Sequence, residues 1–545
     1  MCALVACGDD GPPQQPDARA VVDWPAMSVP TSTVPEAGIR RDVFSVPGVT
    51  AERNPVTDEG SPGALEATQV LRYRQDVQPP VPAQAVLVAM PGFLGGGNSW
   101  DALARNLVRQ GAAQGYALEV WAIDRRANLQ EDLRGADSAE AASDPEIAQG
   151  YYFRDETVGG QAFPGFLRQD DVSYMSEWGL ATHVEDLRRV IDTVPAGEQR
   201  ARVFLLGHSL GASFTEAYAA WRFDDGSRGV EQLAGLVLID GALGDTPLSE
   251  EEYHMGAGAG FTAVPGVDAI RETGPRYFEL PLLGVSVLAR IEVMGLRVLL
   301  DPEGVVEDEG RDDALRLLLQ LGADDPPAMT NAAAFGFGLD DGSNGLSFTA
   351  VSCGAPAGGA VEEYDNILSG VRLIRPTDLD ATYTWDNAGP DTPGEFTPIE
   401  NLANSMVHGV SNFAEWYFPV RLTLDLSAVA GAAVPDDGYQ ASEGLRAFDG
   451  ALIDAPILAI SAGLAAPDRY ESVRARVAPT VGAGRVNEGA DRNQDAGFLI
   501  IDAQELTHVD PLSGGYRPDN PVTDAILDFA MANAAPGEVT IPVME

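Results

Sequence analysis

The sequence predicts an α/β fold in which a mostly parallel central sheet is flanked by helices. Short apolar runs typical of buried strands recur along the chain, at 85–90, 118–123, 203–206, 235–239, 455–461 and 497–502. Apolar residues at helical spacing follow several of these runs, most clearly at 180–194 and 520–534. The alternation stops between about 245 and 454, which indicates a large insertion into the sheet-forming part of the chain.

These patterns divide the chain into four parts. Residues 1–35 are rich in Pro, Asp and Gln and read as a flexible tether, and 36–244 form the first part of the core. Residues 245–454 form the insertion, which we expect to be mainly helical and irregular, with helices near 280–300 and 315–321. Residues 455–545 complete the core. Up to about residue 80 we expect mostly irregular structure.

The composition limits the classes of partner. The 545 residues include 82 acidic and 35 basic side chains, all 35 of them arginine, for a net charge of −47. Nucleic acid is therefore excluded as an expected partner, because its phosphates would be repelled. Three cysteines, Cys2, Cys7 and Cys353, are too few for a disulfide framework, and Cys353 is expected to be a free thiol.

The N-terminus carries a short motif, Leu4-Val5-Ala6-Cys7. It resembles the lipobox of bacterial lipoproteins, with Cys7 as the lipidated residue. The resemblance implies an exported protein that is anchored to a membrane through Cys7 or secreted. No run of about 20 apolar residues follows elsewhere in the chain, so no membrane-spanning helix is expected.

The most informative stretch is 203–212, Val-Phe-Leu-Leu-Gly-His-Ser-Leu-Gly-Ala, an apolar strand followed by a Gly-His-Ser-Leu-Gly turn and a helical pattern. It resembles the nucleophile elbow of the α/β-hydrolase family. A serine hydroxyl is a poor nucleophile unless a sharp turn exposes it beside a base. The resemblance implies that Ser209 is the nucleophile and that 245–454 form a cap.

The family order of nucleophile, acid and histidine suggests the other catalytic residues. His508 lies just after the last predicted strand, where the resemblance places the base. For the acid, Asp468 is preferred, because it follows the strand at 457–460, with Asp240 as the alternative and Glu471 behind it. Among the other histidines, His183 is expected at a helix surface, His208 is expected to point away from Ser209, and His254 and His408 lie in the insertion.

The oxyanion hole needs two backbone N–H groups aimed at the developing negative charge. One is expected from Leu210, directly after the nucleophile. The other is expected from Phe93, because the loop Pro91-Gly92-Phe93-Leu94-Gly95 resembles the family's His-Gly loop with proline in place of histidine.

No cofactor or metal is required by this chemistry. Residues 491–502 partly resemble a calcium loop, with suitable ligand types at Asp491, Asn493 and Asp495. The sixth position holds Ala496 instead of glycine, and the flanking helices are missing, so a solvated acidic loop is the preferred interpretation.

The predicted function is that of a serine hydrolase of the lipase and esterase type, acting on a small-molecule or lipid-like ester. An acyl-enzyme on Ser209 would be resolved by water, and apolar segments such as 413–418 favour a hydrophobic substrate. An acyltransferase or a peptidase on the same fold is an alternative. A catalytically silent, surface-anchored binding protein is a second one.

Overall fold

The computed structural model describes residues 38–258, 263–279, 284–306, 327–366, 370–389, 394–494, 497–517 and 520–539. The predicted tether with Cys7 and the helix expected at 315–321 lie outside these residues. Lipid attachment and export therefore stay predictions from the sequence.

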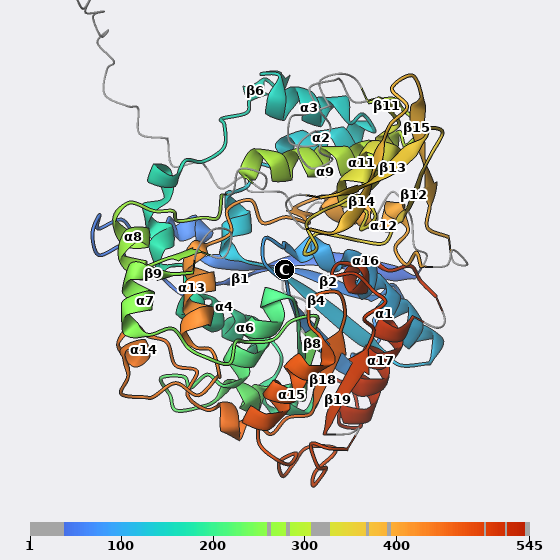
Figure 1. The fold of residues 1–545 in the computed structure, drawn as a ribbon. Helices are drawn as coiled ribbons and strands as arrows, with labels where there is room; N and C mark the ends of the chain where they lie inside the picture. The colour runs from blue at the N-terminus through green and yellow to red at the C-terminus, as the bar shows by residue number, and fades with distance from the viewer. Residues whose placement is uncertain are drawn as a thin grey trace, which may run out of the picture.

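An eight-stranded sheet forms the centre of the molecule (Figure 1), in the order β1-β2-β4-β3-β7-β8-β18-β19. β1 and β2 pair antiparallel, β2 pairs antiparallel with β4, and all the following neighbours are parallel. This is the strand order of the α/β-hydrolase fold, so the predicted fold class is confirmed. The strands are β1 (Ile39–Pro47), β2 (Ala67–Gln75), β3 (Ala85–Met90), β4 (Leu118–Asp124), β7 (Val203–His208), β8 (Gly235–Ile239), β18 (Ile457–Ser461) and β19 (Phe498–Asp502).

Helices cover both faces of this sheet because its central strands are apolar on both sides. In β3 every residue is buried; Val86 and Val88 face one apolar core, whereas Leu87 and Ala89 face the other. The first core includes side chains of α4 (Leu180–Ile191), α6 (Leu210–Ala219) and α15 (Pro467–Arg476). The second includes α1 (Asp101–Ala113), α16 (Asp510–Ser513) and α17 (Pro521–Asn533).

The N-terminal strands correct one expectation. Residues up to about 80 were expected to be mostly irregular, but β1 and β2 form a nine-residue antiparallel pair. Both carry polar residues on their less buried positions, including Arg40, Arg41 and Arg74, which weakens the apolar signal. They form the antiparallel edge of the sheet.

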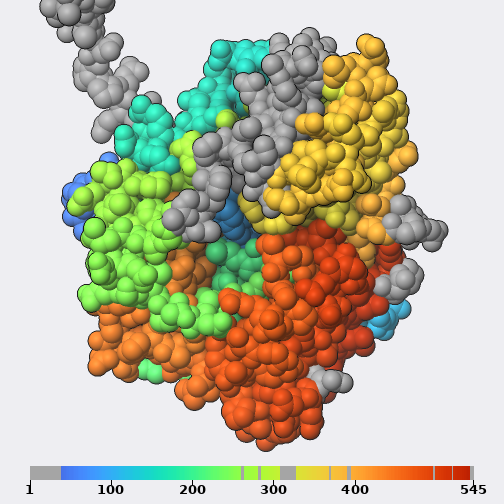
Figure 2. Space-filling view, in the orientation of Figure 1, coloured from blue at the N-terminus to red at the C-terminus, as the bar shows by residue number. Residues whose placement is uncertain are grey.

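One part of the insertion lies above the sheet in Figure 1, where it packs with α2 (Arg134–Ala142) and α3 (Glu146–Phe153), and the other part lies at the left (Figures 1 and 2). Besides helices its described residues contain four small sheets, β10-β9, β11-β15-β12, β13-β14 and β16-β17, which the sequence patterns did not reveal. Its helices are α7 (Glu250–Met255), α8 (Val267–Glu272), α9 (Val285–Leu300), α11 (Asn331–Leu339), α12 (Ile399–Met406), α13 (Val420–Ala428) and α14 (Tyr439–Ser442). The small strands are β9 (Gly256–Ala257), β10 (Val264–Pro265), β11 (Ala328–Met329), β12 (Gly354–Ala357), β13 (Val361–Asp365), β14 (Arg372–Pro376), β15 (Thr382–Asn387), β16 (Val407–His408) and β17 (Ser411–Asn412).

Two further features concern the described residues. None of their helices is both long and apolar enough to cross a membrane. The thiol of Cys353 is buried and free.

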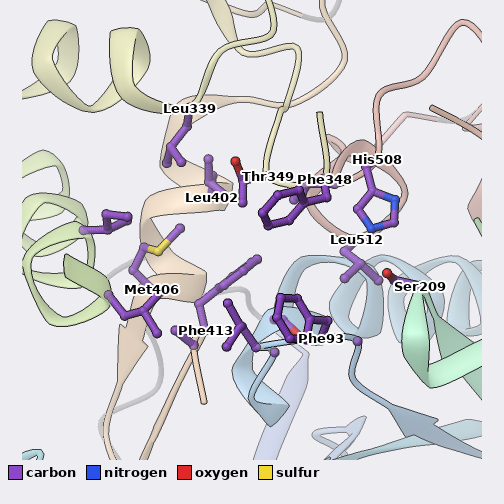
Figure 3. Close-up of a pocket in the computed structure, with 18 of the residues that line it drawn as sticks. Phe93, Ser209, Leu339, Phe348, Thr349, Leu402, Met406, Phe413, His508 and Leu512 are labelled. Carbon is purple, nitrogen blue, oxygen red and sulfur yellow. The ribbon is translucent and has the colours of Figure 1, made fainter. Parts of the chain in front are cut away.

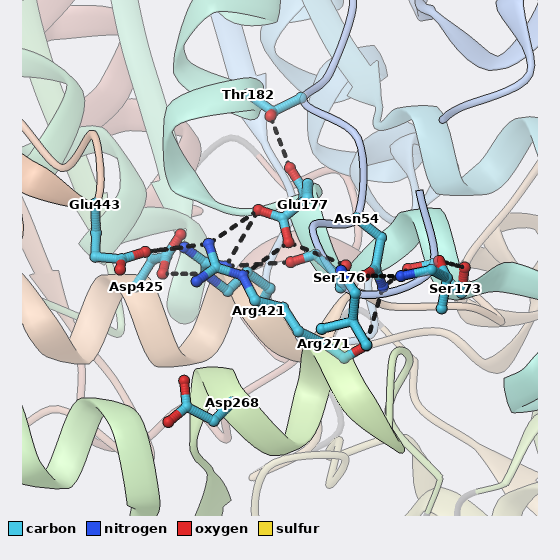
Figure 4. Close-up of polar contacts among 12 residues, drawn as sticks. Asn54, Ser173, Ser176, Glu177, Thr182, Asp268, Arg271, Arg421, Asp425 and Glu443 are labelled. Carbon is cyan, nitrogen blue, oxygen red and sulfur yellow. Dashed lines mark hydrogen bonds and ion pairs between the residues drawn. The ribbon is translucent and has the colours of Figure 1, made fainter. Parts of the chain in front are cut away.

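A buried ion-pair cluster joins the insertion to the core (Figure 4). Arg421 on α13 donates through Nε to Asp425 Oδ1 at 2.7 Å, and its Nη1 donates to the carbonyl oxygen of Ser176 at 3.2 Å. Arg271 on α8 donates to Glu177 at 2.9 Å, and Asp425 Oδ2 accepts the N–H of Leu180, the first residue of α4, at 2.9 Å. The cluster therefore fixes α8 and α13 against the start of α4.

We expect Arg421→Met to lower the free energy of unfolding by about 3–5 kcal/mol, because it leaves the buried carboxylate of Asp425 without its cation. Urea unfolding would measure the loss. Arg168→Met is the matched control, because its side chain is 81% exposed and pairs with Asp171 at the surface. Equal midpoints for the two variants would contradict a stabilising role for the cluster.

Candidate active site

Ser209 occupies a sharp turn between β7 and α6. Its backbone is left-handed, with φ 56° and ψ −123°, an unusual conformation for a residue with a side chain. A Cβ on Gly207 would lie 2.1 Å from the carbonyl oxygen of Gly211, so only glycine lets the strand and the helix approach this closely. Strain of this kind is common at functional sites, and it presents the hydroxyl at the carboxyl end of the sheet.

His508 lies beside Ser209 (Figure 3), in the loop between β19 and α16. Its ring is 3% exposed, and Nδ1 lies 2.7 Å from Oδ2 of Asp240. Because a carboxylate only accepts hydrogen bonds, Nδ1 carries the proton and Nε2 is left free as a base in the neutral ring. The structure thus brings the predicted nucleophile and the predicted base together.

Asp240 follows β8 directly and is held as a carboxylate. Burial disfavours its charge, but the hydrogen bond and charge of His508 and the N–H groups of Ala465 and Leu464 outweigh this, so its pKa is lowered. Ala465 N lies 2.7 Å from Oδ1, Leu464 N lies 2.9 Å from Oδ2, and Ala462 N lies 3.0 Å from Oδ1. The turn after β18 therefore forms a small anion-binding nest for Asp240.

This geometry corrects the predicted acid. Asp468 is the second residue of α15, lies exposed at the start of that helix, and is not the carboxylate that contacts His508. Glu471 is not the carboxylate that contacts His508 either, because it forms a surface pair with Arg474 at 2.7 Å. The turn after β18, which was expected to lead to the acid, instead donates N–H groups to Asp240, the alternative residue.

His183 also differs from expectation, and His208 contacts His508. His183 is buried rather than at the surface, and its Nδ1 donates to the carbonyl oxygen of Gly179 at 2.8 Å. His208 faces His508: the ring centroids are 4.4 Å apart, and His208 Nε2 donates to the carbonyl oxygen of His508 at 2.8 Å. Burial and the charge of His508 lower the pKa of His208 to about 3, so it stays neutral.

Asp510 fixes the loop that carries His508. Its Oδ2 accepts from the Thr507 N–H at 2.9 Å and from the Ser352 hydroxyl at 2.6 Å, while Oδ1 accepts from the Thr397 hydroxyl at 2.7 Å. Ser352 and Thr397 belong to the insertion, so the insertion contacts the histidine loop directly. No sequence motif pointed to Asp510, because its partners Ser352 and Thr397 lie more than 100 residues away in the chain.

The predicted oxyanion donors lie on the two segments that meet at Ser209. Leu210 is the first residue of α6, whose N–H groups at this end have no partner within the helix. The loop after β3 approaches from the other side: a Cβ on Gly92 would lie 3.0 Å from Ser209 Cβ. Phe93 follows Gly92 directly and lines the same cavity as Ser209.

A largely apolar cavity of about 200 Å³ extends from Ser209 and His508 into the insertion (Figure 3). Its wall comes from the core loop at Phe93 and from several insertion segments, including Leu339, Phe348, Leu402, Met406 and Phe413. The expectation that the insertion covers the site agrees with this arrangement. Its apolar lining with a few polar groups is typical of a small-molecule site.

One carboxyl group lies in the wall of this apolar cavity. Glu292 on α9 is buried, and burial raises its pKa to about 8 despite hydrogen bonds from Trp416 Nε1 at 2.8 Å and Ala414 N at 3.1 Å. Nearby Glu131 has a pKa raised well above the usual range by burial and by the charge of Glu292. Glu292 is therefore mostly uncharged near pH 7, so the cavity presents no net charge there.

The described residues contain no group of three or more His, Cys, Asp or Glu side chains placed to hold a metal ion. In the loop that partly resembles a calcium site, Asp491 Oδ1 accepts the N–H of Asn493 at 2.8 Å. Asp495 and Ala496 lie outside the described part of the chain.

Comparisons with solved structures return likenesses of fold. A proposed lipase from Sulfolobus solfataricus is 12% identical, covering 91% of this chain and 94% of that chain, with a TM-score of 0.44. A peroxisomal α/β-hydrolase from Saccharomyces cerevisiae is 8% identical, covering 93% of each chain, with a TM-score of 0.37. An epoxide hydrolase from an endophytic Streptomyces is 12% identical, covering 91% and 96%, with a TM-score of 0.34. No family model and no curated protein matches the sequence.

We expect Asp240→Asn to slow the reaction of Ser209 with a fluorophosphonate probe far more than Asp468→Asn does. An amide cannot stabilise the charged imidazole and favours the wrong tautomer, a change that costs on the order of 10⁴ in the best-studied triad. Time courses of labelling would compare the variants. A slow Asp468→Asn variant beside a normal Asp240→Asn variant would refute the pairing seen here.

Proposed function

We propose that this protein is a serine hydrolase that cleaves carboxylic esters with a hydrophobic acyl group through an acyl-enzyme. The observation that carries the proposal is the Asp240–His508 pair placed beside Ser209 at the mouth of an apolar cavity. The elbow turn and the neutral cavity wall at Glu292 support the same conclusion.

The first half-reaction forms the acyl-enzyme. Ser209 Oγ attacks the acyl carbon and gives its proton to His508 Nε2, while Asp240 stabilises the resulting imidazolium. The carbonyl oxygen of the substrate gains negative charge and accepts hydrogen bonds from the N–H groups of Leu210 and Phe93. When the tetrahedral intermediate collapses, the bond to the alcohol oxygen breaks, and His508 returns the proton to that oxygen.

The second half-reaction releases the acid. A water gives a proton to His508 and attacks the acyl carbon, and collapse of the intermediate frees the acid and returns the proton to Ser209. Because His208 keeps a low pKa beside His508, it does not compete for this proton. Because the cavity holds the acyl group in both half-reactions, we expect the rate to depend on the length of the acyl chain.

We expect the protein to hydrolyse p-nitrophenyl esters and Ser209→Ala to lose activity by a factor on the order of 10⁴ or more. Initial rates over esters of graded chain length would locate the preferred acyl group, and circular dichroism would show that the variant keeps its fold. Asp468→Asn is the matched control and should retain activity. Full activity in Ser209→Ala would contradict the proposal.

The pKa of Glu292 predicts how chain-length preference changes with pH. Above about pH 8 its carboxyl group ionises and places a charge against the apolar acyl chain. We expect the ratio of kcat/KM for a medium-chain ester to that for an acetate ester to fall several-fold between pH 7 and pH 9. Dividing the two constants removes the pH dependence of the catalytic steps that both esters share.

Glu292→Gln should make this ratio independent of pH over the same range. The amide also loses one of the two acceptor oxygens used by Trp416 and Ala414, so a constant offset in activity is expected and only the slope is diagnostic. A ratio that still falls in Glu292→Gln would assign the effect to another group.

A further inference from the structure

Arg125 lies directly under the loop that carries the predicted oxyanion donor Phe93. It follows β4, and its side chain is 2% exposed. Its guanidinium donates to three carbonyl oxygens of that loop: to Pro91 from Nη1 at 2.9 Å, and to Gly92 and Gly95 from Nη2, each at 3.0 Å. The single side chain of Arg125 thus binds three carbonyl groups that lie on the same side of the loop.

These bonds also fix the direction of the N–H groups. In a trans peptide the C=O and the next N–H point in opposite directions. When the Gly92 carbonyl points at Arg125, the Phe93 N–H must point away from it. Gly92 itself packs against Ser209, where an added Cβ would lie 3.0 Å from Ser209 Cβ. Arg125 thereby directs the N–H of Phe93 to the side of the loop opposite the guanidinium.

The insertion holds Arg125 in this position. Glu415, which is fully buried, accepts from Arg125 Nε at 2.8 Å and from Nη2 at 2.5 Å. The same insertion segment also pairs with the loop itself: Glu415 N donates to the Leu94 carbonyl at 2.9 Å, and Gly96 N donates to the Phe413 carbonyl at 2.6 Å. A buried guanidinium needs such a carboxylate, since an unpaired charge at this depth is costly.

We propose that Arg125 is a positioning residue for the oxyanion hole and that Glu415 of the insertion keeps it in place. The oxyanion hole is therefore complete only when the insertion is seated on the core. This inference rests on the proposed function, because it matters only if Ser209 forms a tetrahedral intermediate.

The neighbouring Arg126 offers a matched control. It is equally buried and donates to Asp186 at 2.9 Å and to the Val49 carbonyl at 3.0 Å, which lie away from the oxyanion loop. Arg125→Lys and Arg126→Lys both keep the charge but lose the planar fork, because an ammonium group cannot serve several fixed acceptors at once. The two variants should lose similar thermal stability.

We expect kcat to differ between these two variants. We expect Arg125→Lys to lower kcat on a p-nitrophenyl ester by at least tenfold, and by up to 10²–10³, with little change in KM, the pattern for a misplaced oxyanion donor. Arg126→Lys should keep kcat within about twofold of the parent.

A trifluoromethyl ketone provides a second readout. Ser209 Oγ adds to the ketone carbon, its proton moves to His508, and the ketone oxygen becomes an oxyanion in the hole. Its affinity should fall in Arg125→Lys by the same factor as kcat, whereas a purely structural role would leave this affinity unchanged.

If Arg125→Lys does not fold, the double variant Arg125→Met/Glu415→Leu removes both buried charges and should restore the fold. We expect it to fold and still show the low kcat. A folded Arg125 variant with parental kcat and inhibitor affinity would overturn the inference. Absence of Ser209-dependent hydrolysis in the parent protein would instead overturn the proposed function.

Discussion

The buried carboxylate of Asp240 is the group on which the geometry of the site depends. It lies at φ 46°, so the chain turns sharply as it leaves β8, and the side chain reaches over the neighbouring strands. The N–H groups after β18 and the ring of His508 after β19 converge on it. Because β8, β18 and β19 pair in parallel and in register, their carboxyl ends lie level, and these donors can meet one charge.

The core strands could be predicted because burial on both faces gives continuous apolar runs. β3 and β8 have the predicted ranges, Ala85–Met90 and Gly235–Ile239. β1 and β2 were missed because they form an edge pair in which polar and apolar residues alternate weakly. Local apolar content thus identifies the central strands and also the apolar edge strand β19, but it misses β1 and β2, whose polar residues interrupt the apolar run.

The site residues also differ in how far the local sequence identifies them. Ser209 and His508 were predictable because a local turn motif and a position after the last strand identify them. The acid was not, because both Asp240 and Asp468 follow strands, and only the direction of a turn decides which carboxylate reaches His508. Arg125 and Asp510 lay beyond sequence reasoning altogether, since their partners are backbone carbonyl groups or residues far along the chain.

Buried polar contacts bind the insertion to each working part of the site. Glu415 supports the oxyanion loop through Arg125, Ser352 and Thr397 hold Asp510 next to the histidine loop, and Arg421 fixes α13 against α4. Each contact involves a charged group that is buried away from water. Its contribution to stability is therefore largely lost if the insertion shifts. The insertion therefore acts as a component of the site as well as a wall of the cavity.

The absence of lysine gives these contacts a common chemistry. Arg492 donates to the carbonyl oxygens of Ile453, Ala455, Ala478 and Gly497. Arg125 likewise donates to carbonyl oxygens of the loop that carries Phe93. A guanidinium offers five donors in a rigid plane, whereas an ammonium is a point charge on a flexible stem. In a chain with 82 acidic residues, arginines such as Arg125 and Arg492 are buried inside the fold, where one side chain can satisfy several irregular carbonyl groups and define a loop.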